Sequence, residues 1–277
     1  MKSSLFISVS RIEGLRMIWQ KITRVFEMAF AKRTFTFAQN KILAYDEPAF
    51  RDYPALSRVG KPLGLHLGYV SQGLFPDQAT IDKSPSQNLG YVPMPGDIWY
   101  VDQPNFNGEY DNKINGNDRI YMGMPVDPEI VYGFGGSVKY KKWDFSLFFR
   151  GVARTSLMMT GIHPFGTSSI FSVADFIAED HWSEKNPDPN AAYPRLTKDN
   201  NLNNEAPSDY WLRDASFLKL RNAEIGYTLK NMRFYLSGAN LLTFSPFKHW
   251  DPEMGGGNGL KYPTQRVWNL GFQITIK

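Results

Sequence analysis

Side chains that could act in catalysis or metal binding are scattered along this 277-residue chain. The histidines are His66, His163, His181 and His249, and none of them is spaced as in HExxH or at i, i+4. The chain has no cysteine, which removes thiolate metal ligands, cysteine nucleophiles and disulfides together. It also has no GxSxG elbow and no P-loop. The sequence therefore supports neither a zinc site, nor serine hydrolysis, nor nucleotide chemistry.

One polar segment, Asp111–Asp118, partly resembles a calcium-binding loop. An EF-hand-type loop would need Asp or Asn where Lys113 stands and Glu where Met122 stands. The ammonium of Lys113 would oppose a bound cation. We therefore interpret this segment as a turn-rich loop, and we expect neither a metal nor an organic cofactor.

Carboxylates and aromatic side chains in polar segments are the remaining candidates. A glycosidase needs two carboxylates facing each other across a bond, and the spacing of Glu179-Asp180 or of Asp251 and Glu253 does not establish that geometry. We expect these carboxylates to be solvated and the protein not to be an enzyme. Aromatic rings beside acids and amides could instead stack on sugars or peptides. The candidate substrate contacts are Trp211, His249, Trp250 and Asp251, which could equally be loop-packing residues or anchors at a membrane surface.

Long strands, in which apolar and polar residues alternate, are the elements that must position these segments. At the C-terminus, apolar residues from Trp268 to Ile276 alternate with uncharged polar ones. The same pattern predicts strands over 34–40, 63–70, 130–140, 143–153, 217–229 and 232–244, with two-residue turns at Lys141-Lys142 and Lys230-Asn231. Most of these strands exceed the usual five or six residues and match the roughly 9–11 that a tilted strand needs to cross a bilayer.

The connections between these strands are of two kinds. Besides the short turns there are long segments rich in Pro, Gly and Asn at 45–62, 76–129, 161–215 and 247–265. Short turns at one end and long loops at the other are typical of outer-membrane barrels. The alternative is a soluble or surface carbohydrate-binding β-sandwich with long insertions. Within the third segment, Ser172 and Asp175 form a capping pair that predicts a helix of one or two turns.

Composition excludes several classes of protein. With 42% hydrophobic and 21% charged residues, the chain is not a disordered tail. It has no uncharged apolar stretch of about 18 residues, so it is not a helical membrane protein. The net charge of +4, spread along the chain, is too weak to indicate a nucleic-acid partner.

Residues 1–33 differ from the rest of the chain. The apolar stretch Leu5–Val9 is short and is followed at once by charged residues, so we expect no cleavable export signal. Over residues 11–33, apolar side chains recur at spacings of three and four beside basic ones, which predicts an amphipathic helix. That helix could lie on a membrane surface or pack conventionally. We divide the chain into an unmatched segment, 1–33, and a strand-rich segment, 34–277.

Sequence segments that resemble those of one known family occur in consistent order from about Thr34 to Lys277. The shared segments are Asn40–Pro48, Tyr53–Gly64, Gly68–Phe75, Pro95–Ile98, Ile114–Arg119, Pro128–Gly135, Phe145–Ala153, Ser216–Leu229, Leu236–Phe244, Asp251–Glu253 and Tyr262–Gly271. They resemble the late barrel strands and loops of SusC/RagA-type TonB-dependent outer-membrane transporters.

This resemblance implies the C-terminal part of a transmembrane antiparallel β-barrel of about 22 strands. It also implies outer-membrane lipid as surroundings, import of glycan or peptide fragments, and two partners: the TonB system and a SusD-like surface lipoprotein that acts as a lid. The family's N-terminal plug and TonB-contacting segment have no counterpart in this sequence. We therefore expect the chain not to transport by itself.

Overall fold

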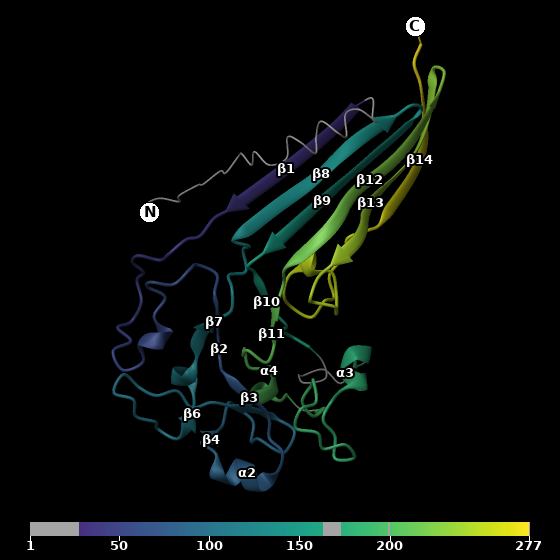
Figure 1. Cartoon of the computed structure of the whole chain (residues 1–277). Helices are drawn as coiled ribbons and strands as arrows, with labels where there is room; N and C mark the ends of the chain where they lie inside the picture. Colours follow the sequence, from purple (N-terminus) through teal and green to yellow (C-terminus); the bar gives the residue numbers. More distant parts are fainter. Residues whose placement is uncertain (1–27, 163–172, 199, 277) are drawn as a thin grey trace.

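The main element of the computed structural model, which describes residues 28–162, 173–198 and 200–276, is a six-stranded antiparallel sheet. Its spatial order is β1-β8-β9-β12-β13-β14. The strands are β1 (Met28–Phe37), β8 (Ile130–Tyr140), β9 (Trp143–Ala153), β12 (Phe217–Leu229), β13 (Met232–Phe244) and β14 (Val267–Ile274). Figure 1 shows them as a long, curved blade, with the remaining segments gathered at one end of it.

The two predicted hairpins are confirmed. Tyr140 pairs with Trp143 across Lys141-Lys142, and Leu229 pairs with Met232 across Lys230-Asn231. Lys141 and Lys230 take left-handed backbone angles, with φ of 55° and 56°, which lets the chain reverse in two residues. Aromatic side chains then meet across strands, as where the rings of Trp143 and Tyr227 lie 4.8 Å apart.

One irregularity interrupts the sheet within β12. Leu220 pairs with Phe149 and Asn222 pairs with Phe148, so Arg221 is an extra residue relative to β9. This β-bulge changes which face successive side chains of β12 occupy. Arg221 donates to the side chain of Asn240 on β13 at 2.7 Å.

The sequence predictions are wrong at two places. A helix was expected over 11–33, but β1 begins at Met28; residues 11–27 lie outside the described residues. The segment 28–33 forms strand because it pairs with β8 in register, from Met28 opposite Lys139 onward. The strand expected over 63–70 is reduced to β2 (His66–Gly68), because Gly68 packs against Pro207 and Tyr69 donates to the carbonyl of Pro207 at 2.9 Å.

The segments beyond the sheet form a second unit, which we call the loop body. Its short strands pair as β2 with β7 (Ile120–Met122), β3 (Ser71–Leu74) with β5 (Ile98–Tyr100), β4 (Ser86–Gln87) with β6 (Lys113–Ile114), and β10 (Ser156–Met158) with β11 (Leu212–Asp214). Its helices are α2 (Gln78–Lys83), α3 (Asp175–Glu179) and α4 (Leu202–Glu205), with 3-10 turns η2 (Pro54–Leu56), η3 (Gly116–Asp118) and η4 (Pro252–Met254). The predicted short helix is confirmed as α3. The predicted capping pair is wrong, because the N-cap is Ala174 and Asp175 is the first residue of the helix; Ser172 itself lies outside the described residues.

The hydrophobic core lies in the loop body rather than on the sheet. Its buried members are Tyr69, Leu74, Ile98, Tyr100, Ile114, Leu157, Met158, Met159, Ile162, Ile177, Trp182, Ala191, Tyr193, Ala206, Trp211, Ala215 and Phe247. The long connecting segments are therefore folded parts of one packed unit and not simple solvated loops. In the part of the chain that the structure describes, no helix is long and apolar enough to cross a bilayer.

Candidate functional site

The six-stranded sheet has an outer face that is apolar except for Arg33 of β1, and the described residues do not cover it. Strand register places every second residue of neighbouring strands on this face, which carries Trp143, Phe145, Leu147, Phe149, Trp268, Leu270, Phe272 and Ile274. Most of these side chains are exposed, up to 84% for Leu270. No second sheet of the described residues packs over them. Such a face is too apolar for water and fits hydrocarbon.

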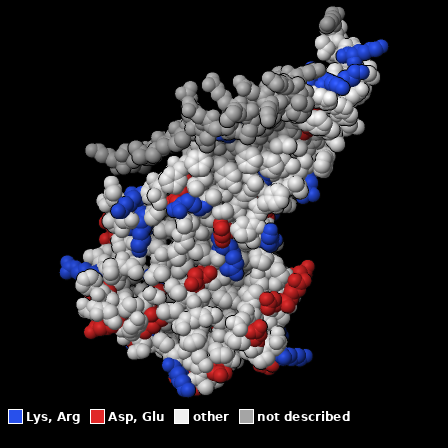
Figure 2. Space-filling view, in the orientation of Figure 1, with Lys and Arg blue, Asp and Glu red and all other residues white. Residues whose placement is uncertain are grey.

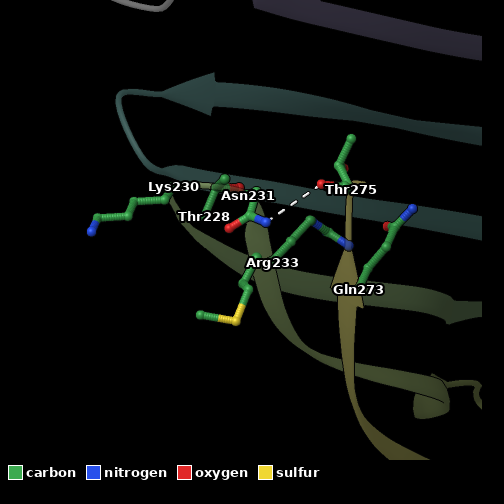
Figure 3. Close-up of a pocket in the computed structure, with 7 residues that line it drawn as sticks. Thr228, Lys230, Asn231, Arg233, Gln273 and Thr275 are labelled. Carbon is green, nitrogen blue, oxygen red and sulfur yellow. Dashed lines mark hydrogen bonds between the residues drawn. The ribbon is translucent and has the colours of Figure 1, made fainter. Parts of the chain in front are cut away.

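The inner face of the sheet is polar, as the alternation predicts. Arg233 on β13 donates to Asp144 on β9 at 3.0 Å, and to Glu224 on β12 at 2.6 Å. These ion pairs join three neighbouring strands across one face. Close to the turn end, Arg233, Gln273 and Thr275 line a hollow of about 470 Å³ (Figure 3). Asn231 from the β12–β13 turn closes one side and donates to the carbonyl of Thr275 at 3.5 Å.

Charged side chains are unevenly distributed over the surface of the molecule. In the visible part of Figure 2, most Lys, Arg, Asp and Glu side chains lie over the loop body or near the turn end of the sheet. The visible surface between them is mostly uncharged. Charged side chains concentrated toward the two ends of the strands are the pattern expected of strands that cross a bilayer.

Asp251, one of the predicted substrate contacts, lies where the loop body meets the sheet. Lys219 of β12 is 1% exposed, and its Nζ donates to Asp251 and to Glu253, each at 2.6 Å. Burial opposes ionisation of Asp251, but the hydrogen bonds from Lys219 and from the Glu253 backbone outweigh it and lower the pKa of this carboxyl. Both carboxylates were expected to be solvated; instead they are half-buried and neutralise a buried ammonium.

Trp211, His249 and Trp250 belong to one aromatic cluster of the loop body. Trp211 is 3% exposed, and its indole donates to the carbonyl of Asn204 at 2.7 Å. His249 lies 3.1 Å from the hydroxyl of Tyr193, and Trp250 packs edge-on against Phe247 with ring centroids 4.6 Å apart. Burial, together with the nearby charge of Arg213, lowers the pKa of His249.

Exposure separates these candidates. His249 and Trp250 are partly open to solvent, whereas Trp211 lies in the core. The indole of Trp250 donates to the carbonyl of Gly255 at 2.9 Å, which fixes the orientation of its ring. The structure thus brings His249, Trp250 and Asp251 to one surface region through the segment 247–259, with Trp211 beneath the neighbouring rings.

Sequence analysis missed a buried polar network centred on Asp97. This carboxylate is fully buried, pairs with Arg195 at 2.7 Å, and accepts hydrogen bonds from Asn201 at 3.0 Å and Asn204 at 2.9 Å. It holds the turn before β5 against α4. The asparagine-rich run at 200–204 was the available signal, because asparagines grouped in this way commonly serve as caps and bridges.

The segment that partly resembles a calcium loop is a capped turn. Asp118 accepts hydrogen bonds from the backbone N–H of Gln103 at 2.8 Å and of Asn115 at 2.6 Å, and Asn115 caps η3. Among the described residues, no group of three or more His, Asp or Glu side chains is arranged to hold a metal ion.

Comparisons with known proteins point to one group. No family model matches the chain. It is 27% identical over 242 residues to TonB-dependent receptor P26 of Formosa agariphila, which covers 79% of this chain and 23% of that protein. It is 24% identical over 225 residues to TonB-dependent receptor SusC of Bacteroides thetaiotaomicron, which covers 75% of this chain and 20% of SusC.

The fold gives the same result. A solved structure of the RagAB peptide transporter superposes on 89% of this chain with a TM-score of 0.63, at 19% identity, and the match covers 27% of that chain. The all-β, antiparallel class is confirmed, with long strands, short turns at one end and long connections at the other. The chain spans about a quarter of the length of the curated relatives and of that structure. Over most of its own length, it is similar in sequence and in fold to SusC/RagA-type TonB-dependent receptors.

Proposed function

We propose that residues 28–277 form part of the transmembrane wall of an outer-membrane transporter that imports glycan or peptide fragments. The uncovered apolar face of the six-stranded sheet carries this proposal, because a soluble sandwich would bury the corresponding side chains under a second sheet. In this arrangement the outer face contacts lipid, and the face of Asp144 and Arg233 lines the lumen. The loop body lies on the extracellular side. The protein has no enzymatic role.

The partners follow from the same proposal. The loop body contacts a SusD-like surface lipoprotein, and the TonB system acts through a plug that the parent transporter supplies. RagAB, which is named as a peptide transporter, supports peptide fragments as one class of cargo. The six-stranded sheet alone does not transport, because β1 and β14 at its edges need partner strands in hydrocarbon.

Within the loop body, we assign ligand contact to His249 and Trp250, which lie at the surface. Trp211 supports them from beneath through the aromatic cluster, and Asp251, which lies in the same surface region, is held by Lys219. Binding of oligosaccharides or oligopeptides to the chain in detergent should weaken with His249→Ala and Trp250→Ala. Trp143→Phe on the outer face is the matched control and should bind like the unmodified chain.

Partition tests the membrane assignment. We expect the chain to aggregate in buffer and to become soluble in dodecyl maltoside, where detergent covers the apolar outer face of the sheet. A folded monomer in buffer without detergent would favour the carbohydrate-binding sandwich instead. Expression of the chain in a transporter-deleted strain should not restore growth on a glycan or peptide source. Restored uptake by this chain alone would contradict the fragment assignment.

A further inference from the structure

A basic arm leaves the sheet directly after β1. The segments 40–45 and 58–63 run side by side, because Ile42 donates to the carbonyl of Lys61 at 2.9 Å and Gly60 donates to that of Ile42 at 2.8 Å. Asn40 accepts from the backbone N–H of Leu63 at 2.6 Å. The paired segments carry the cations Lys41, Arg58 and Lys61 beside exposed apolar side chains such as Leu63.

Two phenols hold Arg58 in one orientation. Its Nε donates to the hydroxyl of Tyr121 at 3.0 Å, and its Nη1 donates to that of Tyr45 at 2.9 Å. A guanidinium has five N–H donors, so these two bonds leave donors available for an incoming anion. An arginine fixed in this way binds an anion with less loss of side-chain entropy than a free one.

Lys61 brings a second cation to the same place. Its Nζ lies 4.3 Å from the ring centre of Tyr121 and also donates to the carbonyl of Ala55. Burial lowers the pKa of this ammonium, which means that it has lost solvation that an anion could replace. The carboxylate of Glu47 interacts electrostatically with Lys61, and it accepts hydrogen bonds from Ser57 at 2.5 Å and from the backbone of Arg58 at 3.1 Å. Glu47 offsets one of the local positive charges and leaves an excess.

Apolar walls surround these cations. Arg58, Lys61 and Tyr121 line a pocket of about 240 Å³ together with Ile42, Leu63 and Leu67. A soluble anion would leave these walls in water, whereas a lipid would cover them with its glycerol and acyl groups. The combination of cations and apolar walls therefore favours an amphiphilic ligand.

The pocket lies at the depth expected for lipid headgroups, just beyond the part of β1 that would cross the hydrocarbon layer. Phe37 on the outer face of β1 is partly exposed, and Lys41 follows four residues later, a distance of at most about 14 Å for an extended chain. Lipid headgroups lie directly beyond the hydrocarbon layer that such a strand crosses. The arm leaves the sheet at the end where the loop body lies (Figure 1).

We propose that the pocket between Arg58, Lys61 and Tyr121 binds the phosphate monoester of a membrane lipid at the loop-body end of the sheet. Arg58 and Lys61 donate to the phosphate oxygens, and Ile42, Leu63 and Leu67 contact the lipid backbone. This inference rests on the proposed function, because it needs β1 to lie in the membrane.

The test measures lipid binding by the full chain in dodecyl maltoside micelles. The probes are phosphatidic acid, diacylglycerol with the same acyl chains, and inorganic phosphate. We expect phosphatidic acid to bind, and Arg58→Gln with Lys61→Gln to weaken that binding roughly tenfold or more, since both charge-assisted contacts are lost. Lys113→Gln with Lys185→Gln removes the same charge from exposed sites of the loop body and should have little effect.

Folding and ligand source are checked in the same samples. Lys61→Arg, which keeps the charge, should retain binding, and far-UV circular dichroism should match among the variants. Equal binding of diacylglycerol and phosphatidic acid, or an equal loss in the control variant, would overturn the lipid site. Inorganic phosphate that binds as tightly as phosphatidic acid would overturn the lipid as its source. A chain that does not enter micelles would refute the membrane assignment, and the lipid site with it.

Discussion

The sheet and the loop body place similar side chains in opposite environments. On the sheet, tryptophans and leucines point outward from the outer face, while the carboxylate of Asp144 lies on the inner face. In the loop body, Trp211 and Tyr100 are buried, and so is the carboxylate of Asp97. Apolar side chains are therefore buried away from solvent in the loop body, but not on the outer face of the sheet. The proposed contact with lipid rests on the regular pattern of exposed apolar residues that the sheet carries.

The largest expected effect is the loss of the Asp97 carboxylate. Asp97→Ala would leave Arg195 without its partner at 2.7 Å and would remove acceptors from Asn201 and Asn204. We expect the loop body to lose about 3 to 5 kcal/mol of stability, as when one partner of a buried pair is removed. Urea unfolding in micelles, followed by near-UV circular dichroism, measures this loss.

Asp144→Ala is the control for that prediction, because it breaks an ion pair on the inner face of the sheet. Both Arg233 and Asp144 are about one-quarter exposed, and Glu224 still pairs with Arg233. The expected cost is about 1 kcal/mol or less. Equal costs for Asp97→Ala and Asp144→Ala would show that the two regions do not differ as described.

The next effect concerns the two faces of β9. Leu147→Arg places a charge on the outer face and should destabilise the sheet in lipid bilayers by about 2 to 4 kcal/mol. Ser146→Arg places the same charge on the inner face and should cost much less. Folding titrations in bilayers compare the two variants. A similar penalty for Ser146→Arg would contradict the assignment of the faces.

A moderate, pH-dependent effect is expected where the two regions meet. The lowered pKa of Asp251 means that its stabilising contribution is complete at neutral pH and is lost as pH falls below about 3.8. Lys219→Met removes the cation and should abolish that dependence, while proteolysis of segment 247–259 becomes faster. Stability measured at pH 7 and at pH 3 tests this. An unchanged acid loss in Lys219→Met would show that other carboxyls cause it.

The smallest effect concerns His249. Because burial lowers its pKa below the ordinary 6.5, folding favours the neutral imidazole, and stability falls as pH drops through 6.5 toward the lowered value. NMR titration of His249 should give a midpoint below that of the same residue in an unfolded peptide. Tyr193→Phe removes the hydroxyl that lies 3.1 Å away and tests whether this contact matters. A midpoint at or above 6.5 would contradict the burial of His249.

The sequence predicts the sheet well, because strand alternation and two-residue turns are local properties. The strands 130–140, 143–153, 217–229 and 232–244 have the predicted bounds. The sequence predicts β1 poorly, because Met28–Arg33 fits both the spacing of a helix and the alternation of a strand. Only the pairing with β8 decides that this segment is a strand. Local pattern contains no information about such a distant partner.

The loop body was the least predictable region. Asp97 meets Asn204 across 107 residues of sequence, and Lys219 meets Asp251 across 32. No spacing rule links residues so far apart. The aromatic candidates Trp211, His249 and Trp250 were recognisable from the sequence. The full burial of Trp211 and the partial exposure of Trp250 depend on packing that the sequence does not display.

The β-bulge at Arg221 has a consequence for insertions and deletions. On the turn side of the bulge, the outer face of β12 takes odd-numbered residues such as Ile225, and on the loop-body side it takes even-numbered ones such as Leu220. Loss of one residue in a regular part of a strand would exchange its two faces. Loss of Arg221 would instead join the two parts of β12 into one regular alternation, with each side chain still on its present face. We therefore expect relatives to gain or lose a residue here more readily than elsewhere in the sheet.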